Sequence, residues 1–300
     1  MDMTQNKCCR HGASLRRRRR RRRKILCFII FSCSIIAVAV FVAVGSSMIR
    51  SGDGRTNRYD VEAGNNTYDN AVIENSKISE KNKIQNNQSM LDDIMNSTQY
   101  PKQLKDLALK NEEALEFVYD YPAEHVKEHT IDLTEEASMD SVPLFVQWDK
   151  RWGYEKYSGN FFAASGCGPT TLSMVVVYLT HNRDASPIAV AKYSKEAGYS
   201  VDGSGSSWTL ISEGCRHYGV KAKTVALDES RMKAELDEGH PIVVNVGPGD
   251  FTDTGHFMVI TGYDDEGFSI NDPNSIEKSG KRWLFRNISS QIRAVWSMYV

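Results

Sequence analysis

The stretch that decides the fold is SGCGPTTLSMVVVYLT, residues 165–180, in which one cysteine stands between two glycines and precedes a proline and an apolar run. Pro169 suits the first turn of an α-helix, because the N–H that proline lacks would be unpaired there. The apolar residues that follow predict a buried helix over residues 169–180. The flanking glycines leave the backbone around Cys167 open to close approach. Cys167 is therefore expected at the N-terminus of a firmly held helix.

A cysteine in that position is suited to act as a nucleophile. Unpaired N–H groups and the helix dipole stabilise an anion there, so the pKa of the thiol falls and more of it is the attacking thiolate. The alternative is a structural cysteine, or a disulfide between Cys167 and Cys215. These two are the only cysteines after residue 49. Two thiols do not make a disulfide framework, so a small disulfide-stapled domain is excluded.

A general base is expected at His256, which begins an apolar strand in GHFMVITGYDDEGFSINDP, residues 255–273. The DDEG turn and the returning FSIND segment predict an antiparallel hairpin centred near residue 265. That register sets Asp272 opposite residue 258 and beside His256. A carboxylate on one imidazole nitrogen and a thiol on the other would form a nucleophile, its base and the group that orients the base.

Each of these assignments has a plainer alternative. A histidine on a strand is often an ordinary buried side chain, and Asn-Asp-Pro is a common turn sequence. In a different register Asn271, and not Asp272, would orient the imidazole of His256. The two registers place different side chains beside the ring, so the structure of the hairpin decides between them.

The elements around these motifs predict an α+β domain. Helical patterns come first and strand patterns gather near the C-terminus, without the regular alternation that builds a parallel sheet. The expected helices cover residues 187–197, 207–218 and 229–239, and the expected strands cover 142–148 (VPLFVQW), 222–227, 241–247 and 294–300.

Three motifs in this order carry a resemblance to a known family. VPLFVQWDKRWG, SGCGPTTLSMVVVYLT and GHFMVITGYDDEGFSINDP resemble papain-superfamily cysteine peptidases related to the double-glycine leader peptidases of bacteriocin exporters. The resemblance covers residues 142–300. It implies a papain-like fold, in which a helical half carries the cysteine, an antiparallel sheet carries the histidine, and substrate binds between them.

The resemblance also implies roles for individual residues. It implies a catalytic triad of Cys167, His256 and Asp272. It implies that the side-chain amide of Gln147 donates, beside the backbone N–H of Cys167, to the oxyanion formed during attack. From the residues alone, Gln147 could equally be a surface glutamine.

No cofactor and no metal ion are expected. The chain contains no GxxxxGK[ST], HExxH or CxxC motif. It also lacks the Walker A motif of the exporter enzymes, so the resemblance does not extend to coupled cleavage and export. Three tryptophans, Trp148, Trp152 and Trp208, are candidates to line the substrate cleft, with core packing as the alternative.

The N-terminal part of the chain carries a membrane signal. Residues 16–24 are nine consecutive cations, and residues 25–49 contain no charged side chain. The apolar stretch is long enough to cross a bilayer as a helix, and the cations are expected to stay in the cytoplasm. This pattern predicts a cytoplasmic basic segment over 1–24, a transmembrane signal anchor over 25–49 and an extracellular catalytic domain on the cell membrane. A cleaved signal peptide, with a small-residue site at Ala43–Gly45, is the alternative.

Two further segments separate this anchor from the domain at 142–300. Residues 50–98 are rich in Asn, Ser, Asp and Lys without apolar periodicity, which predicts a disordered stalk. Residues 99–141 begin with apolar residues at helical spacing, which predicts a helical prefix and linker.

Charge restricts the partners. Of 37 Lys and Arg residues and 38 Asp and Glu residues, 11 and one respectively lie in residues 1–24, so the remainder carries a net charge of −11. An acidic domain is not suited to nucleic acid, and the cation block beside an apolar span is explained by topology. The expected partners are a peptide or protein substrate, with a cell-wall peptide as one candidate, and the membrane through residues 25–49.

The sequence therefore predicts a membrane-anchored, extracytoplasmic thiol peptidase or amidase that hydrolyses a peptide or amide bond. One alternative is a peptidoglycan peptide hydrolase or acyl transferase with the same triad, and competition between water and a free amine would identify transfer. The other alternative is a non-catalytic peptide-binding module on the same fold. The complete set of candidate catalytic residues argues against that module.

Overall fold

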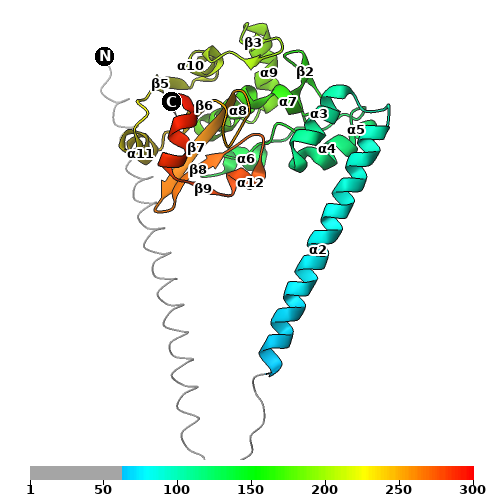
Figure 1. Ribbon diagram of the computed structural model, residues 1–300. Helices are drawn as coiled ribbons and strands as arrows, with labels where there is room; N and C mark the ends of the chain where they lie inside the picture. The colour runs from blue at the N-terminus through cyan, green and yellow to red at the C-terminus, as the bar shows by residue number, and fades with distance from the viewer. Residues whose placement is uncertain (1–62) are drawn as a thin grey trace, which may run out of the picture. The chain divides into compact units, whose positions relative to one another are not determined.

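An antiparallel sheet of six strands lies at the centre of the part of the chain that the computed structural model describes, residues 63–300 with side chains from residue 79 (Figure 1). The strand order is β5-β10-β6-β7-β8-β9, and every neighbouring pair is antiparallel. The strands are β5 (Lys221–Thr224), β6 (Ile242–Val246), β7 (His256–Asp264), β8 (Gly267–Asn271), β9 (Arg282–Trp283) and β10 (Ile292–Tyr299). Two small ribbons pair β1 (Lys156–Tyr157) with β2 (Asn160–Phe161) and β3 (Ser200–Val201) with β4 (Gly205–Ser206).

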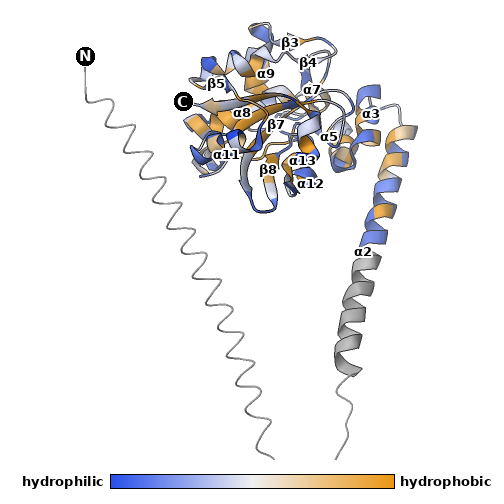
Figure 2. Cartoon of the chain, turned by 60° about the vertical axis from the view of Figure 1, so that its left-hand side comes forward, coloured by the Kyte–Doolittle hydropathy of each residue, from blue (hydrophilic) through white to orange (hydrophobic). Residues whose placement is uncertain are grey.

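The central helix of the domain is α8 (Cys167–Thr180), which packs against β7 and against α9 (Pro187–Glu196). Its residues from Gly168 to Val177 are all buried, because most of them are apolar and the hydroxyls of Thr171 and Ser173 donate to the carbonyls of Phe257 and Ala185. Figure 2 shows α8 and the neighbouring strands as the most hydrophobic part of the fold. A helix buried in this way holds its first residue, Cys167, in a fixed place.

Shorter helices complete the described structure. They are α3 (Lys102–Lys110), α4 (Leu115–Tyr119), α5 (Tyr121–Glu124), α6 (Thr134–Ser138), α7 (Phe162–Ser165), α10 (Thr209–Ser212), α11 (Glu229–Asp237), α12 (Ile276–Ser279) and α13 (Phe285–Ile288), with the 3-10 turns η1 (Glu112–Ala114), η2 (Gly214–Tyr218) and η3 (Ser289–Gln291).

The sheet has an apolar core on each face. Successive residues of a strand point to opposite faces, and β7 follows this rule. Phe257 and Val259 belong to the core shared with α8, whereas Met258 and Ile260 belong to the core shared with α11. The predicted α+β arrangement is confirmed, since the helices precede a sheet that is built mainly from the C-terminal part of the chain.

Two details differ from the expected elements. Residues 142–148 are not a strand, because Pro143 lacks a donor and other contacts hold the segment in place of a ladder. The side-chain amide of Asn271 donates to the carbonyls of Val142 and Pro143. The expected helix over 207–218 is divided into α10 and η2 at Glu213.

The prediction of disorder over residues 50–98 is wrong for its larger part, because Ala63–Asn96 form helix α2. The last turns of α2 contain Leu91, Ile94 and Met95, which pack in one apolar cluster with α3 and α4. Ile94 is completely buried. Tertiary contact at one end supplies the stability that a polar helix lacks by itself.

The predicted helical prefix is present as α3, η1, α4 and α5. Its apolar stripe is buried, as expected for core packing: Leu104, Leu107, Ala108, Leu115 and Val118. These residues share a cluster with Phe161 and Ala163 of β2 and α7. The prefix therefore packs directly beside the chain that leads into Cys167.

Between residues 63 and 300 no helix combines the length and the apolar character needed to cross a membrane. The predicted basic segment at 1–24 and the predicted anchor at 25–49 lie outside the described residues.

Candidate active site

Cys167 is the first residue of α8, and its side chain is partly buried. Both neighbouring glycines are required by close contacts. A Cβ atom would lie 2.6 Å from the ring of Phe162 if placed at Gly166, and 2.5 Å from Oγ of Ser206 if placed at Gly168. The predicted helix N-terminus and the predicted open backbone around the thiol are both confirmed.

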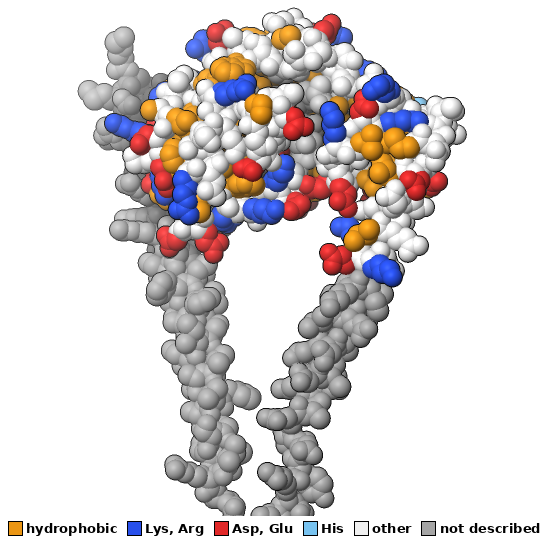
Figure 3. Space-filling view, in the orientation of Figure 1, with side chains coloured by type: hydrophobic (Ala, Val, Ile, Leu, Met, Phe, Trp, Pro, Cys, Tyr) orange, Lys and Arg blue, Asp and Glu red, His pale blue; other side chains and the backbone are white. Residues whose placement is uncertain are grey.

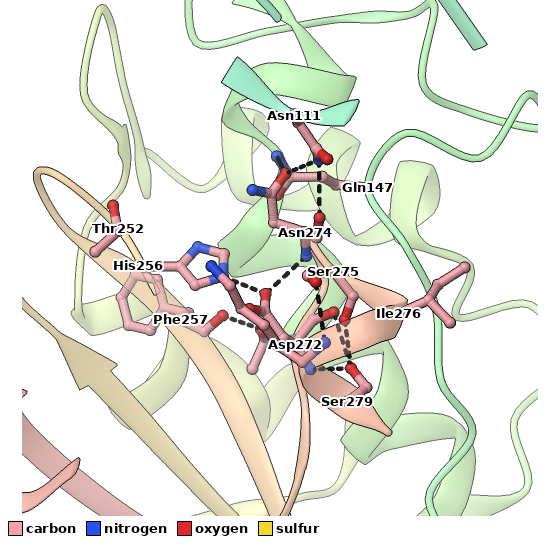
Figure 4. A network of polar contacts seen from close by, with 12 residues as sticks. Asn111, Gln147, Thr252, His256, Phe257, Asp272, Asn274, Ser275, Ile276 and Ser279 are labelled. Carbon is pink, nitrogen blue, oxygen red and sulfur yellow. Dashed lines mark hydrogen bonds and ion pairs between the residues drawn. The ribbon is translucent and has the colours of Figure 1, made fainter. Parts of the chain in front are cut away.

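His256 and Asp272 meet as the sequence predicted. Nε2 of His256 lies 2.7 Å from Oδ1 of Asp272, and the two side chains are buried (Figure 4). The pairs Val259–Asn271 and Ile260–Ile270 have the predicted register. A bulge after Ile260 shifts the register by one residue, but this shift affects only the part of the hairpin between the bulge and the turn. Asp272 therefore follows the last paired residue of β8 and reaches the ring.

Asn271 does not orient the imidazole. Its side-chain amide donates to the carbonyl oxygens of Val142 at 3.2 Å and Pro143 at 3.0 Å. Since Nε2 of His256 is bonded to the carboxylate of Asp272, the other ring nitrogen, Nδ1, is available to the thiol. The alternative left open by the sequence is decided in favour of Asp272.

The charges of the site favour a thiolate beside an imidazolium. Burial acts to raise the pKa of the Cys167 thiol, but the hydrogen bond and charge of His256, with backbone hydrogen bonds at Phe257 and Gly168, lower it overall. Burial acts to lower the pKa of His256, but the charge and hydrogen bond of Asp272, together with Cys167, raise it overall. Each of the two groups therefore stabilises the charged form of the other.

Cys215 has the opposite environment. It is completely buried in the core shared by α8 and the sheet, and burial raises the pKa of its thiol to about 11, although Arg216 acts in the other direction. Both Cys167 and Cys215 are free thiols. The alternative of a disulfide between them is therefore wrong for this structure.

The residues after β8, 272–277, form a short segment that we call the Asp272 loop. Oδ1 of Asp272 accepts a second hydrogen bond, from the backbone N–H of Asn274 at 2.8 Å. The backbone N–H of Asp272 donates to Oγ of Ser279 at 2.9 Å. Oδ2 of Asp272 is buried and has no hydrogen-bond partner among the described residues. The orientation of the carboxylate therefore depends on the bonds at Oδ1.

Gln147 is buried, so the alternative of a surface glutamine is wrong. Its backbone N–H donates to the carbonyl of Pro273 at 2.7 Å, which ties it to the Asp272 loop. Its Nε2 donates to the carbonyl of Ala163 at 2.7 Å and makes a longer bond of 3.4 Å to Oδ1 of Asn274. One amide hydrogen is thus firmly held, and the other is held only weakly.

The three tryptophans have different surroundings. Trp152 is buried in the core, and its indole N–H donates to the carbonyl of Val146, so cleft lining is wrong for this residue. Trp148 donates to the carbonyl of Asn274 at 3.2 Å. Trp208 is 45% exposed and lies edge-on to Trp296, so it stays a candidate for contact with substrate.

Sequence reasoning missed Asn274, which joins several parts of the site. Its backbone contacts Asp272, and its side chain accepts from Gln147. A local signal was present, because an aspartate commonly accepts a hydrogen bond from the N–H two residues later, and Asp-Pro-Asn is typical of such a turn. The contact of Asn274 with Asn111 in the helical prefix has no such signal.

A model of the Peptidase C39-like family matches residues 139–300. The peptidase domain of Streptococcus ComA, a bifunctional ABC transporter of a quorum-sensing pathway, is 20% identical, with a TM-score of 0.36 over 45% of this chain and 90% of that one. A C39-like peptidase from Bacillus anthracis is 16% identical, with a TM-score of 0.34 over 53% and 95%. Among curated proteins there is no significant match.

The family match covers more than half of the 300 residues, and it contains Cys167, His256 and Asp272. The fold agrees with it, because the cysteine begins a buried helix and the histidine begins a strand of an antiparallel sheet, as in the papain-like arrangement. The chain belongs to the Peptidase C39-like family.

Proposed function

We propose that this chain is a cysteine peptidase in which Cys167 attacks the carbonyl carbon of a peptide bond. The observation that carries the proposal is the buried pair of His256 and Asp272, 2.7 Å apart, beside a thiol whose pKa is lowered. A merely structural cysteine would need neither a charged partner nor a helix N-terminus.

The proposed reaction has two stages. The thiolate of Cys167 adds to the carbonyl carbon, and the imidazolium of His256 gives its proton to the leaving amine as the C–N bond breaks. Water then attacks the thioester while His256 accepts its proton, which releases the carboxylic acid and restores the thiol. Asp272 holds the ring in one tautomer and stabilises its positive charge throughout.

The oxyanion of each tetrahedral intermediate needs donors. The backbone N–H of Cys167 has no acceptor within α8, because it belongs to the first residue of the helix. The weakly held amide hydrogen of Gln147 is suited to be the second donor, since the bond it would give up is 3.4 Å long.

We further propose that the peptidase domain lies outside the cell membrane, held by residues 25–49. The support is the sequence pattern of nine cations followed by an uncharged apolar stretch. The domain itself presents acidic and basic side chains interspersed over the face drawn in Figure 3. Protease added to intact cells should remove the domain and spare a cytoplasmic control. A domain protected from protease would contradict this orientation.

The activity is tested by comparing protein termini in cells that make the wild type and cells that make Cys167→Ala. New N-termini that depend on Cys167 are expected in surface proteins, and they would identify the substrate. Identical sets of termini, together with a wild-type thiol that is not alkylated near neutral pH, would contradict peptidase activity.

A further inference from the structure

The helical prefix, which precedes the family match at residue 139, contacts the Asp272 loop directly. The contacts come from η1 and from Asn111, the residue before it. Asn111 and Asn274 are separated by 163 positions in the chain, and Figure 4 shows them side by side. Prefix and loop are therefore joined by hydrogen bonds between segments that are distant in the sequence.

Asn111 uses its whole side-chain amide. Its Nδ2 donates to the backbone carbonyl of Asn274 at 2.9 Å and to the side-chain Oδ1 of Asn274 at 3.1 Å. Its Oδ1 accepts from the backbone N–H of Glu113 at 3.0 Å, which caps η1. One side chain thus fixes the start of η1 and the middle of the Asp272 loop.

Glu113 holds the rest of the loop. Its carboxylate accepts from Oγ of Ser275, from the backbone N–H of Ile276 at 2.7 Å and from that of Glu277 at 3.1 Å. These donors belong to the N-cap residue and the first turn of α12, where an anion is stabilised by the unpaired N–H groups.

The loop that these two side chains hold also carries the orienting carboxylate. The backbone N–H of Asn274 donates to the same oxygen of Asp272 that bonds to His256. The Oδ1 of Asn274 accepts from both Asn111 and Gln147. If Asn111 were lost, the amide of Gln147 would be the remaining donor to that oxygen and would be drawn away from an oxyanion.

We infer that Asn111 and Glu113 are positioning residues, which act through the Asp272 loop to orient Asp272 toward His256. The inference rests on the proposed peptidase function and extends the functional unit to a segment outside the family match. No substrate contact is assigned to either residue.

The test is the rate at which iodoacetamide alkylates Cys167 in the full chain between pH 5 and pH 9, with each labelled cysteine located by mass spectrometry. Asn111→Asp is the sharpest variant, because it keeps the oxygen that caps η1 and replaces the donor to Asn274 by a second oxygen. Glu113→Gln keeps one acceptor and should have a smaller effect. Glu112→Gln is the matched control, since Glu112 is exposed and its carboxylate bonds to Asn87 of α2.

At pH 6 the rate for Asn111→Asp should fall between about tenfold and about a hundredfold, because small displacements around a reacting group have effects of this size. Near pH 9 it should approach the wild-type rate, since a thiol with an ordinary pKa of about 8.5 is mostly ionised there. Glu112→Gln should follow the wild type throughout. A purely structural role would lower the melting temperature without changing the pH profile.

Two outcomes would overturn the inference in distinguishable ways. In the first, the wild type reacts at pH 6, and both Asn111→Asp and Glu113→Gln show the same pH profile as the wild type. This outcome overturns the positioning role and leaves the proposed function standing. A wild-type Cys167 that does not react at pH 6 overturns the proposed function, and the positioning role with it. If Asn111→Asp does not fold, the pH profile of Cys167 alkylation in Glu113→Gln tests the positioning role instead.

Discussion

His256 and Asp272 share a hydrogen bond of 2.7 Å in an environment that water hardly reaches, since the side chains are 7% and 1% exposed. Replacing Asp272 by Asn keeps the shape of the side chain and removes its charge. The pKa of His256 should then fall and that of Cys167 should rise, because an imidazolium no longer faces the thiol. Each unit of increase lowers the thiolate fraction at pH 6 about tenfold, which the alkylation rate measures. Unchanged reactivity at pH 6 would show that Asp272 does not control the pair.

Cys167 and Cys215 should differ in their reactivity toward a thiol reagent. The pKa of Cys167 is lowered, so at pH 6 more of this thiol is ionised than of an ordinary thiol, whose pKa is about 8.5. Labelling of Cys167 is therefore expected near pH 6. Burial raises the pKa of Cys215 to about 11, so this thiol should stay unlabelled until the protein unfolds. Peptide mapping after brief treatment with iodoacetamide checks both. Preferential labelling of Cys215 would contradict the assignment of the nucleophile.

Asn271→Ala should separate stability from chemistry. The side chain bonds to the carbonyls of Val142 and Pro143 and not to the imidazole. Its loss should lower the free energy of unfolding by about 1 kcal/mol, measured by denaturant titration. The pH profile of Cys167 alkylation should stay that of the wild type. A profile like that of Asp272→Asn would mean that the hairpin has the other register in solution.

Gly168→Ala should disturb the helix start. The new methyl group would meet Oγ and Cβ of Ser206 at 2.5 and 2.7 Å, and Ser206 is itself bonded to the hydroxyl of Tyr157. Overpacking of this kind costs about 1–3 kcal/mol, which thermal or chemical unfolding measures. Gly262→Ala is the matched control, because a Cβ atom there has no neighbour within 4 Å. Equal stability of the two variants would contradict the close approach of β4 to Gly168.

Gln147→Ala removes the second proposed oxyanion donor. Once a substrate is known from the analysis of termini, kcat should fall by about 10²–10³ while KM changes little. His256→Ala should abolish turnover, because it removes the base. A Gln147→Ala enzyme with normal kcat would assign the second donor to another group.

Much of the site was predictable because it depends on local signals. The turn residues and the apolar strands fixed the hairpin within one chain segment, so the approach of Asp272 to His256 followed from the register. The helix at Cys167 followed from Pro169 and the apolar run after it. Contacts between residues that are close together in the chain can be predicted from the local sequence.

The parts that could not be predicted depend on distant contacts. Residues 142–148 look like a strand, but their partner is the side chain of Asn271. The polar sequence of α2 has no helical pattern, and the helix is anchored by the apolar residues at its end. Nothing in the sequence near Asn111 or Glu113 indicates that they hold the Asp272 loop, because their partners lie more than 160 residues away.

Asn111 and Asn274 are far apart in the chain, so Asn111 is synthesised long before its partner. The helix that begins with Cys167 leaves the ribosome before β7, and the contact between Asn111 and Asn274 waits for the strands after it. The pKa of Cys167 is lowered by His256, so a nascent chain that ends before the hairpin carries a thiol of ordinary reactivity. Chemical activation of the sulfur thus requires the C-terminal hairpin that carries His256.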